Sequence, residues 1–366
     1  MSAAALKQSK RSVGRQLFAA IALSIFCSPT YLAAQTAPTL EPGPKPHDIP
    51  ARWKPWIGEY GWPPSSVPMS EVDVVSEKDG YIVWLKRYSS SAGMRYEIGD
   101  KFPVRGSYPS VHGLRTDRSG RRELVSGDVV TGKITPDFDA RAQILIKPVR
   151  PVAELRAEAL DSSPPREEGP FRKPELVELT TLDPAIHLDI RYATANDFLG
   201  TPVYTQARAF MQRPAAEALV RALHKLQPLG YGLLIHDAYR PWYVTKIFWD
   251  ATPPEGKIFV ADPAQGSRHN RGCAVDLTLY DLATGKPIEM PGTYDEMSPR
   301  SFPDYPGGTS LQRWHRDLLR RAMESEGFTV YEHEWWHFDY KDWHAYPILN
   351  IKFEDLHSGQ GLASSK

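Results

Sequence analysis

Three short stretches in the second half of the chain carry residues whose types and spacing could do chemistry. In the stretch 267–276, His269 lies in a polar, glycine-containing turn and Asp276 lies on a predicted strand. Because side chains alternate along a strand, Asp276 would share one face with Thr278 and Tyr280. A rigid element would then hold the carboxylate while the histidine folds back towards it. Taken alone, the pair is explained equally well by an ordinary His–Asp hydrogen bond.

The second stretch, 331–338, allows two interpretations. His333-Glu334-Trp335-Trp336-His337 fits the H-E-x-x-H pattern, in which a helix presents two zinc-binding histidines and a glutamate base. The surrounding residues are aromatic and β-branched, which favours a strand. In the strand interpretation His337 joins His269 and Asp276 as a metal ligand, Glu334 is the nearby base, and His333 has no role in the site.

Two imidazole nitrogens and one carboxylate oxygen suit Zn²⁺ and leave a fourth position for water, as in catalytic sites. A structural zinc site would need four protein ligands, usually including cysteine. The chain has two cysteines, Cys27 and Cys273. Cys273 would point away from Asp276, so we interpret it as a packing residue. The sequence therefore predicts one catalytic Zn²⁺ ion per chain.

The third stretch, 235–242, reads as a short strand that ends in a turn marked by Pro241. Arg240 lies in this turn. By default such an arginine forms a surface ion pair. At the end of a strand that leads into a site, its guanidinium could instead stabilise an oxygen that gains negative charge.

Together these motifs resemble a known family. Ser267-x-His269-x-x-Gly272-x-Ala274-x-Asp276 with Glu334-Trp335-Trp336-His337 is similar to the zinc D-alanyl-D-alanine dipeptidases of the VanX type, within the D-Ala-D-Ala metallopeptidase superfamily. Further similar segments are 191–198, 237–241, 276–280 and 295–298. The resemblance covers roughly residues 177–350 and does not extend to the N-terminal part, which the compact enzymes of this type lack.

The resemblance implies a role for each matching residue. His269, Asp276 and His337 would bind zinc, Glu334 would move the proton, and Arg240 would stabilise the oxyanion. Ser267 and Asp295 match positions that hold the substrate's ammonium group, and Tyr192 matches a residue that lines the pocket.

The implied activity is hydrolysis of D-Ala-D-Ala or a closely related dipeptide, linked to peptidoglycan precursor or turnover metabolism. Two alternatives stay open: a D,D-carboxypeptidase that acts on cell-wall peptides, and a cell-wall-binding protein with a non-catalytic zinc site. The presence of Glu334 argues against the second alternative, because a non-catalytic zinc site would not need a general base.

Periodicity predicts the elements that must position these residues. Apolar residues recur at helical spacing in 213–229 and 311–325, and strand-like runs occupy 232–235, 274–280 and 327–331. We therefore expect residues 175–357 to form an α+β catalytic domain, with a small antiparallel sheet flanked by helices.

A small all-β domain is expected before it, at residues 56–151. Turn signals predict one hairpin around 77–80 and another around 115–121, and residues 143–146 read as a further strand. Its aromatic residues would suit a contact with peptidoglycan, although such residues more often fill a core. Pro-rich segments at 36–55 and 152–174 are predicted linkers, and 358–366 a flexible tail.

Residues 1–35 have the pattern of a secretory signal peptide. Basic residues precede an apolar run at 17–26 that is too short to cross a bilayer, and small residues follow at Ala33-Ala34. We expect an exported protein, periplasmic in preference to lipid-anchored at Cys27. Lys+Arg and Asp+Glu both number 44, so the charge pattern of a nucleic-acid binder is missing. The expected partner is a small dipeptide, with no nucleic acid and no stable membrane span.

Overall fold

The computed structural model of the 366-residue chain describes residues 39–61, 72–90, 93–103, 113–126, 129–135 and 145–356. The described residues from Leu40 onward belong to one compact unit. The predicted signal peptide and C-terminal tail lie outside the described residues. Among the described helices, none combines the length and apolar character needed to cross a membrane.

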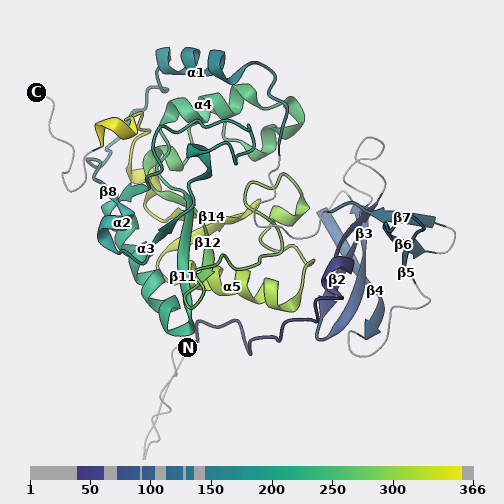
Figure 1. Cartoon of the computed structure of the whole chain (residues 1–366). Coiled ribbons are helices and arrows are strands. Elements are labelled where there is room, and N and C mark those ends of the chain that lie inside the picture. The colour runs from purple at the N-terminus through teal and green to yellow at the C-terminus, as the bar shows by residue number, and fades with distance from the viewer. Residues whose placement is uncertain are drawn as a thin grey trace, which may run out of the picture. The chain divides into compact units, whose positions relative to one another are not determined.

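The expected α+β fold is present in the C-terminal half, around a curled five-stranded sheet (Figure 1). Its strands, in spatial order, are β13 (Phe328–Tyr331), β14 (Glu334–Tyr340), β12 (Ala274–Asp281), β11 (Tyr231–Asp237) and β9 (His187–Leu188). The first four pair antiparallel, as predicted. The edge strand β9 pairs parallel with β11, a departure that the long connection through a helix between them makes feasible.

Two amphipathic helices lie where the periodicity predicts them. They are α3 (Arg213–Leu226) and α5 (Ser310–Glu324), and their apolar sides enter the same core as the apolar face of β12. Helix α5 begins at a capping box, in which Thr309 and Gln312 exchange side-chain to backbone hydrogen bonds. Helices α2 (Leu179–Leu182) and α4 (Trp242–Ala251) add to this core.

Several shorter elements complete this half of the chain. A two-stranded sheet pairs β8 (Leu176–Glu178) with β10 (Phe210–Gln212). The 3₁₀ helices among all described residues are η1 (Lys54–Trp56), η2 (Arg191–Ala193), η3 (Gln227–Leu229), η4 (Pro254–Phe259), η5 (His269–Arg271), η6 (Pro299–Ser301), η7 (Trp343–Ala345) and η8 (Phe353–Asp355).

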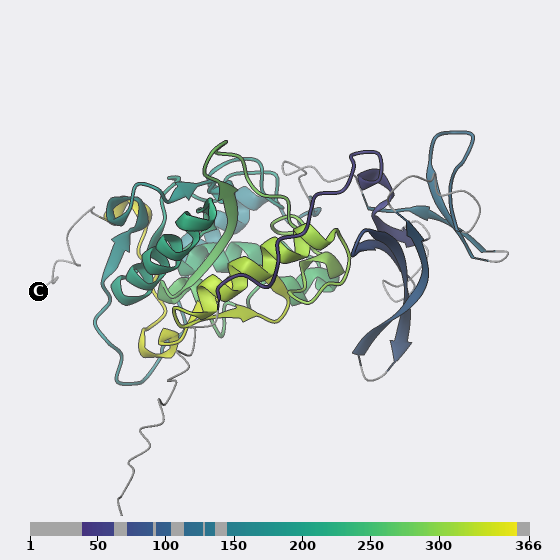
Figure 2. The same cartoon turned by 90° about the horizontal axis from the view of Figure 1, so that it is seen from below.

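Parts of both predicted linkers are ordered structure instead. Residues 152–161 form helix α1 (Val152–Asp161), whose Leu155 and Ala159 are fully buried in the main core. The apolar side of α1 is short, and the Pro-rich run that follows it obscures the signal. In the first linker, the Trp314 indole donates to the carbonyl of Gly43, and this segment runs along α5 (Figure 2).

A second, seven-stranded antiparallel sheet precedes α1 and is called the N-terminal sheet below. Its strands are β1 (Gly58–Gly61), β2 (Asp73–Lys78), β3 (Tyr81–Ser90), β4 (Gly93–Pro103), β5 (Leu114–Thr116), β6 (Arg122–Ser126) and β7 (Val129–Lys133), in the spatial order β4-β3-β2-β1-β7-β6-β5.

Both predicted hairpins are confirmed in this sheet. Lys78 pairs with Tyr81 across a two-residue turn, in which Asp79 and Gly80 both have positive φ, as a type I′ hairpin requires. β5 and β6 form the second hairpin.

The strand predicted at 143–146 is wrong where it can be seen. Leu145 and Ile146 are not in a strand, and the Ile146 amide donates to the carbonyl of Phe198 instead. Residues 143 and 144 lie outside the described part.

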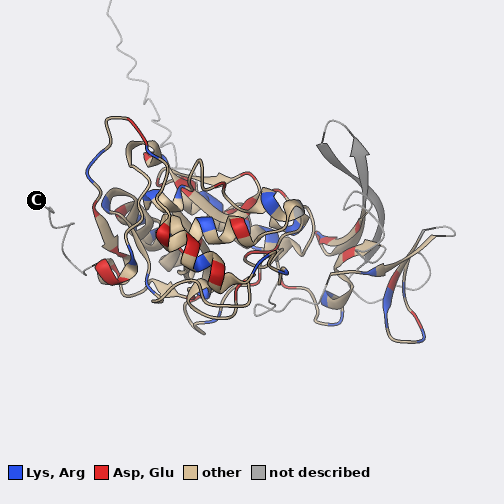
Figure 3. Cartoon of the chain, turned by 90° about the horizontal axis from the view of Figure 1, so that it is seen from above, with Lys and Arg blue, Asp and Glu red and all other residues tan. Residues whose placement is uncertain are grey.

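Lys, Arg, Asp and Glu are interspersed along the helices (Figure 3).

Candidate active site

Three buried side chains from different elements bring their donor atoms together. His269 lies on η5, Asp276 on β12 and His337 on β14, and the last two are direct cross-strand partners. His269 Nε2 is 3.0 Å from His337 Nδ1 and 3.3 Å from Asp276 Oδ1, and His337 Nδ1 is 3.0 Å from the same oxygen. Ligands about 2.0–2.1 Å from a tetrahedral zinc ion would lie roughly 3.3 Å apart, so these atoms match the edges of such a site.

Neighbouring groups fix which ring nitrogen of each histidine is free. His269 Nδ1 is 2.7 Å from the carbonyl of Ala238, and His337 Nε2 is 2.9 Å from Asp339 Oδ1. A ring N–H donated to these acceptors leaves the lone pairs of His269 Nε2 and His337 Nδ1 pointing at one another, as in metal sites.

The carboxylate of Asp276 is divided between two environments. Its Oδ2 accepts a hydrogen bond from the Tyr294 hydroxyl, while its Oδ1 is buried and has no hydrogen-bond partner. A buried, unpartnered carboxylate oxygen is costly. A cation between the two histidines and Asp276 would supply the missing partner, so the residues present fit a bound metal ion.

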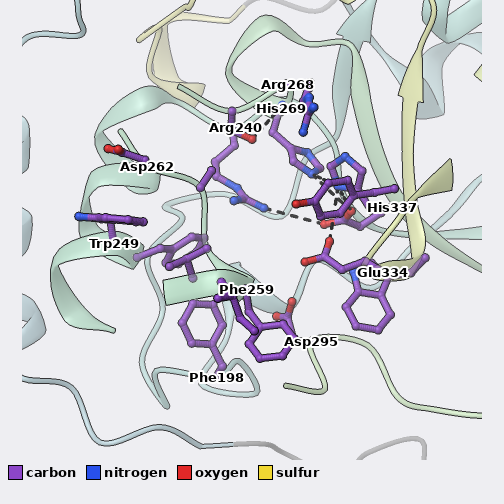
Figure 4. A pocket seen from close by; sticks show the side chains of 18 of the residues that line it. Phe198, Arg240, Trp249, Phe259, Asp262, Arg268, His269, Asp295, Glu334 and His337 are labelled. Carbon is purple, nitrogen blue, oxygen red and sulfur yellow. Dashed lines mark hydrogen bonds and ion pairs between the residues drawn. The ribbon is translucent and has the colours of Figure 1, made fainter. Parts of the chain in front are cut away.

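Glu334 begins β14 and faces the same point (Figure 4). Its Oε2 is 3.7 Å from His337 Nδ1. Burial, together with the charge of Asp276 and against the opposing effect of His337, raises the pKa of Glu334 to about 7. A carboxyl group with that pKa can both accept and release a proton near neutral pH.

The helical H-E-x-x-H interpretation is wrong, because residues 334–340 form a strand. His333 lies in the turn before β14, where its side chain is 40% exposed and its Nε2 is 3.6 Å from Glu332. Within the described residues, the set of groups placed to hold a metal contains His337 but not His333.

Arg240 follows β11 and is buried beside the three donor atoms. Its Nε and Nη2 donate to Asp237 Oδ2 at 2.9 and 2.7 Å, and Nη2 is 3.9 Å from Asp276 Oδ2. The Tyr204 hydroxyl donates to the other oxygen of Asp237. The default alternative of a surface ion pair is wrong, because the Arg240–Asp237 pair is buried and fixes the guanidinium at the wall of a cavity.

Asp295 and Tyr192 meet on another side of that cavity. The Tyr192 hydroxyl donates to Asp295 Oδ1 at 3.0 Å, while Asp295 Oδ2 is buried and has no hydrogen-bond partner. Burial, reinforced by the charges of Asp276 and Glu334, holds the pKa of Asp295 well above its usual range. Asp295 also has φ +58°, a conformation that is uncommon outside glycine. The position is therefore set by its surroundings.

All eight predicted site residues line one cavity of about 320 Å³. They are Tyr192, Arg240, Ser267, His269, Asp276, Asp295, Glu334 and His337. The Ser267 hydroxyl accepts a hydrogen bond from the His269 amide, which ties it to the metal-ligand turn. Apolar side chains close another part of the wall, including Phe198, Trp249 and Phe259 (Figure 4).

Sequence reasoning missed three residues that support this site: Asp237, Tyr294 and Asp339. Asp339 could have been found, since it lies two positions after His337 and therefore on the same face of β14. Asp237 stands three residues before Arg240, but nothing in that spacing indicates a pair. For Tyr294, no local pattern indicates that its hydroxyl reaches Asp276.

Comparison with known proteins first gives the class of the protein. The peptidase M15 family, described as D-ala-D-ala dipeptidase, matches residues 172–357, which hold the five-stranded sheet and the cavity. The protein is accordingly a metallopeptidase. It belongs to this family of D-alanyl-D-alanine dipeptidases, as the VanX-type resemblance predicts.

Individual relatives agree over nearly their whole length. A D-alanyl-D-alanine dipeptidase of Escherichia coli (strain K12) is 36% identical over 179 residues, which is 91% of that protein and 49% of this chain. Proteins of the same name from Enterococcus faecalis and Streptomyces coelicolor are 36% and 35% identical, over 95% and 87% of their lengths. The match to the family begins after the N-terminal sheet.

Proposed function

We propose that the protein hydrolyses D-Ala-D-Ala, or a closely related dipeptide, to free amino acids with one bound Zn²⁺ ion, in peptidoglycan precursor or turnover metabolism. The observation that carries the proposal is the convergence of His269, Asp276 and His337 in one cavity with Glu334 and Arg240. The relatives' shared name supports the choice of substrate.

Zinc held by His269 Nε2, Asp276 Oδ1 and His337 Nδ1 would polarise the scissile carbonyl and lower the pKa of a bound water. Glu334, whose Oε2 lies 3.7 Å from His337 Nδ1, accepts the proton of the attacking water and then delivers it to the leaving amine. The guanidinium of Arg240, held by Asp237, stabilises the negative charge that develops on the carbonyl oxygen.

The free ammonium of the dipeptide would be held by Asp295 and Ser267, beside Tyr192. The unpartnered Oδ2 of Asp295 supports this assignment, because an ammonium would supply its missing hydrogen-bond donor. A substrate with a blocked amino terminus would leave this carboxylate unsatisfied. The enzyme should therefore select free dipeptides over longer or blocked peptides.

The test compares D-Ala-D-Ala with N-acetyl-D-Ala-D-Ala and with a wall pentapeptide, using the zinc-loaded protein. We expect D-alanine release from the free dipeptide to exceed release from the blocked one by about 10²-fold or more in kcat/KM, because the acetylated nitrogen cannot form the ion pair with Asp295. Equal rates on the dipeptide and the pentapeptide would instead support the D,D-carboxypeptidase. A protein that binds wall fragments and zinc without turnover would support the non-catalytic alternative.

We also propose export to the periplasm, on the signal-peptide pattern of residues 1–35. Cell fractionation with N-terminal sequencing of the mature protein tests this. We expect a start shortly after Ala34, and a chain that retains Met1 in the cytoplasm would contradict the proposal.

A further inference from the structure

The segment that carries Tyr294 and Asp295 is residues 289–309, called the substrate loop below. It is the later part of the connection from β12 to α5, and η6 is its one regular element. The loop folds closely on itself, since a Cβ on Gly292 would lie 2.6 Å from the Arg300 carbonyl oxygen and Arg300 Nε donates to the carbonyl of Pro291. A loop with so little regular structure depends on neighbouring elements for its position.

Strand β2 of the N-terminal sheet binds the C-terminal end of this loop. The Glu77 amide donates to the carbonyl of Gly308 at 3.0 Å, and the Ser76 hydroxyl lies 2.9 Å from the same oxygen. Glu77 Oε2 accepts from the amide of Ser310, the first residue of α5, at 2.7 Å. Glu77 is 3% exposed and Ser76 2%, so water competes little for these bonds.

Arg313, on the first turn of α5, joins the same contact. Its Nη2 donates to the carbonyl of Glu77 at 2.7 Å, and its Nη1 lies 3.0 Å from both the Ser76 hydroxyl and the carbonyl of Gly308. One guanidinium therefore links the strand, the end of the loop and the start of the helix.

Two further contacts lie along the loop. Tyr305 is buried against Val74, Val83 and Leu85 of the N-terminal sheet, in an apolar cluster of these four residues. At the other end, Lys54 Nζ lies 3.4 Å from Glu289 Oε2. The beginning, middle and end of the substrate loop thus all contact the N-terminal part of the chain.

We propose that the N-terminal sheet is a positioning element for substrate binding, and that Ser76 and Glu77 hold the substrate loop so that Asp295 faces the cavity. The inference rests on the proposed role of Asp295. Asp295 combines a positive φ with a buried, unpartnered oxygen, an arrangement that persists only where the surrounding structure imposes it. Loosening the contact with β2 would let the loop relax and Asp295 turn away.

The experiment uses the full-length mature protein and the variants Glu77→Ala, Glu77→Gln and Glu123→Ala. Glutamine keeps one of the two backbone hydrogen bonds of Glu77, to Gly80 or to Ser310, so it should give an intermediate effect. Glu123 pairs with Arg115 elsewhere on the same sheet and is the matched control. If Glu77→Ala does not fold, Ser76→Ala is used in its place, because that substitution removes only a hydroxyl.

For Glu77→Ala we expect KM for D-Ala-D-Ala to rise about five- to tenfold while kcat changes less, because ammonium binding is weakened and the proton-transfer groups are untouched. Preference over N-acetyl-D-Ala-D-Ala should fall in parallel. Amide hydrogen exchange within 289–309 should become faster, with zinc content unchanged. Glu123→Ala should alter none of these quantities.

Unchanged KM together with unchanged exchange in 289–309 would overturn the inference. So would equal effects of Glu77→Ala and Glu123→Ala. The exchange measurement needs no turnover, so it tests the hold on the loop even if D-Ala-D-Ala proves not to be the substrate. In that event the comparison of the free dipeptide with the blocked dipeptide and the pentapeptide contradicts the proposed function separately.

Discussion

At the scale of single residues, the site divides between groups that would touch substrate or metal and groups that hold them. His269, Asp276 and His337 present donor atoms, while the carbonyl of Ala238 and the side chain of Asp339 orient the imidazoles. Each orienting contact favours the ring tautomer whose second nitrogen, facing the other donor atoms, is free to bind a metal ion.

Glu334→Gln tests the separation of proton transfer from metal binding. The amide cannot accept the proton of water, so we expect kcat to fall by about 10²-fold or more while zinc content stays near one per chain. Zinc is measured by elemental analysis and turnover by D-alanine release. Asp276→Ala should lose both zinc and turnover, whereas His333→Ala should keep both. Loss of zinc in His333→Ala would contradict the assignment of the ligands.

Tyr294→Phe tests the group behind Asp276. Removing its hydroxyl frees Asp276 Oδ2, so the carboxylate is less firmly oriented, and we expect zinc affinity to fall about 10-fold or more. Competition with a chromogenic chelator measures this affinity. Tyr280→Phe is the matched control, because Tyr280 lies on the same strand as Asp276 and its hydroxyl donates to the carbonyl of Ala185, away from the donor atoms. Equal affinities of the two variants would contradict the role of Tyr294.

At the scale of elements, α5 both closes the core and receives contacts from the N-terminal part. Its His315 is buried next to Tyr231, whose hydroxyl lies 3.0 Å from His315 Nε2 and 2.6 Å from Lys45 Nζ. Burial and then the Lys45 charge, against a smaller effect of Asp48, lower the pKa of His315 to about 4. The folded protein therefore resists protonation of this ring.

This shift gives stability a defined pH dependence. Above about pH 6.5 His315 is neutral in both states and contributes nothing. As the pH falls from 6.5 towards 4, the unfolded chain gains a proton that the folded chain does not, so up to about 3 kcal/mol of stability is lost. Urea unfolding of wild type and His315→Asn at pH 7.5 and 4.5 measures the difference, and the variant should lose less on acidification. Equal losses would contradict the buried neutral histidine.

At the scale of the whole molecule, the chain has one region that matches the dipeptidase family, residues 172–357, and further structure on its N-terminal side. The family match begins at residue 172, yet α1 precedes it and buries Leu155 and Ala159 in the same core. The N-terminal sheet likewise packs against the substrate loop, residues 289–309, of the part that matches the family. The added segments are therefore part of the folded structure around the site.

Two shortened chains test this integration. A chain that begins at Lys147 keeps α1, and one that begins at Ser163 lacks it. We expect the shorter chain to be less stable by about 3 kcal/mol, because the surface that receives Leu155 and Ala159 becomes exposed. Both chains lack the N-terminal sheet, so both should show a raised KM. Urea midpoints, zinc content and the KM for D-Ala-D-Ala are the measurements. Equal midpoints would show that α1 adds nothing to the core.

The sequence by itself determined most of the local elements and indicated the residues that line the cavity. Strand alternation places Asp276 on one face of β12, the apolar spacing defines α3 and α5, and the aromatic, β-branched surroundings of His337 decide strand over helix. These properties depend on neighbours within a few positions, which the order of residues states directly. The apolar side of α1 and the apolar run at 143–146 are too short for the sequence to distinguish a helix, a strand and a loop there.

Only the tertiary structure decided which residues that are distant in the sequence lie in contact. The 3.0 Å cross-strand contact of His337 with Asp276, the reach of Tyr294 to the same carboxylate, and the hold of Ser76 and Glu77 on the substrate loop join residues 18 to 233 positions apart. No local pattern encodes such pairs, because they follow from how sheets pair and loops pack. That packing places a buried carboxylate at residue 295 and keeps it there.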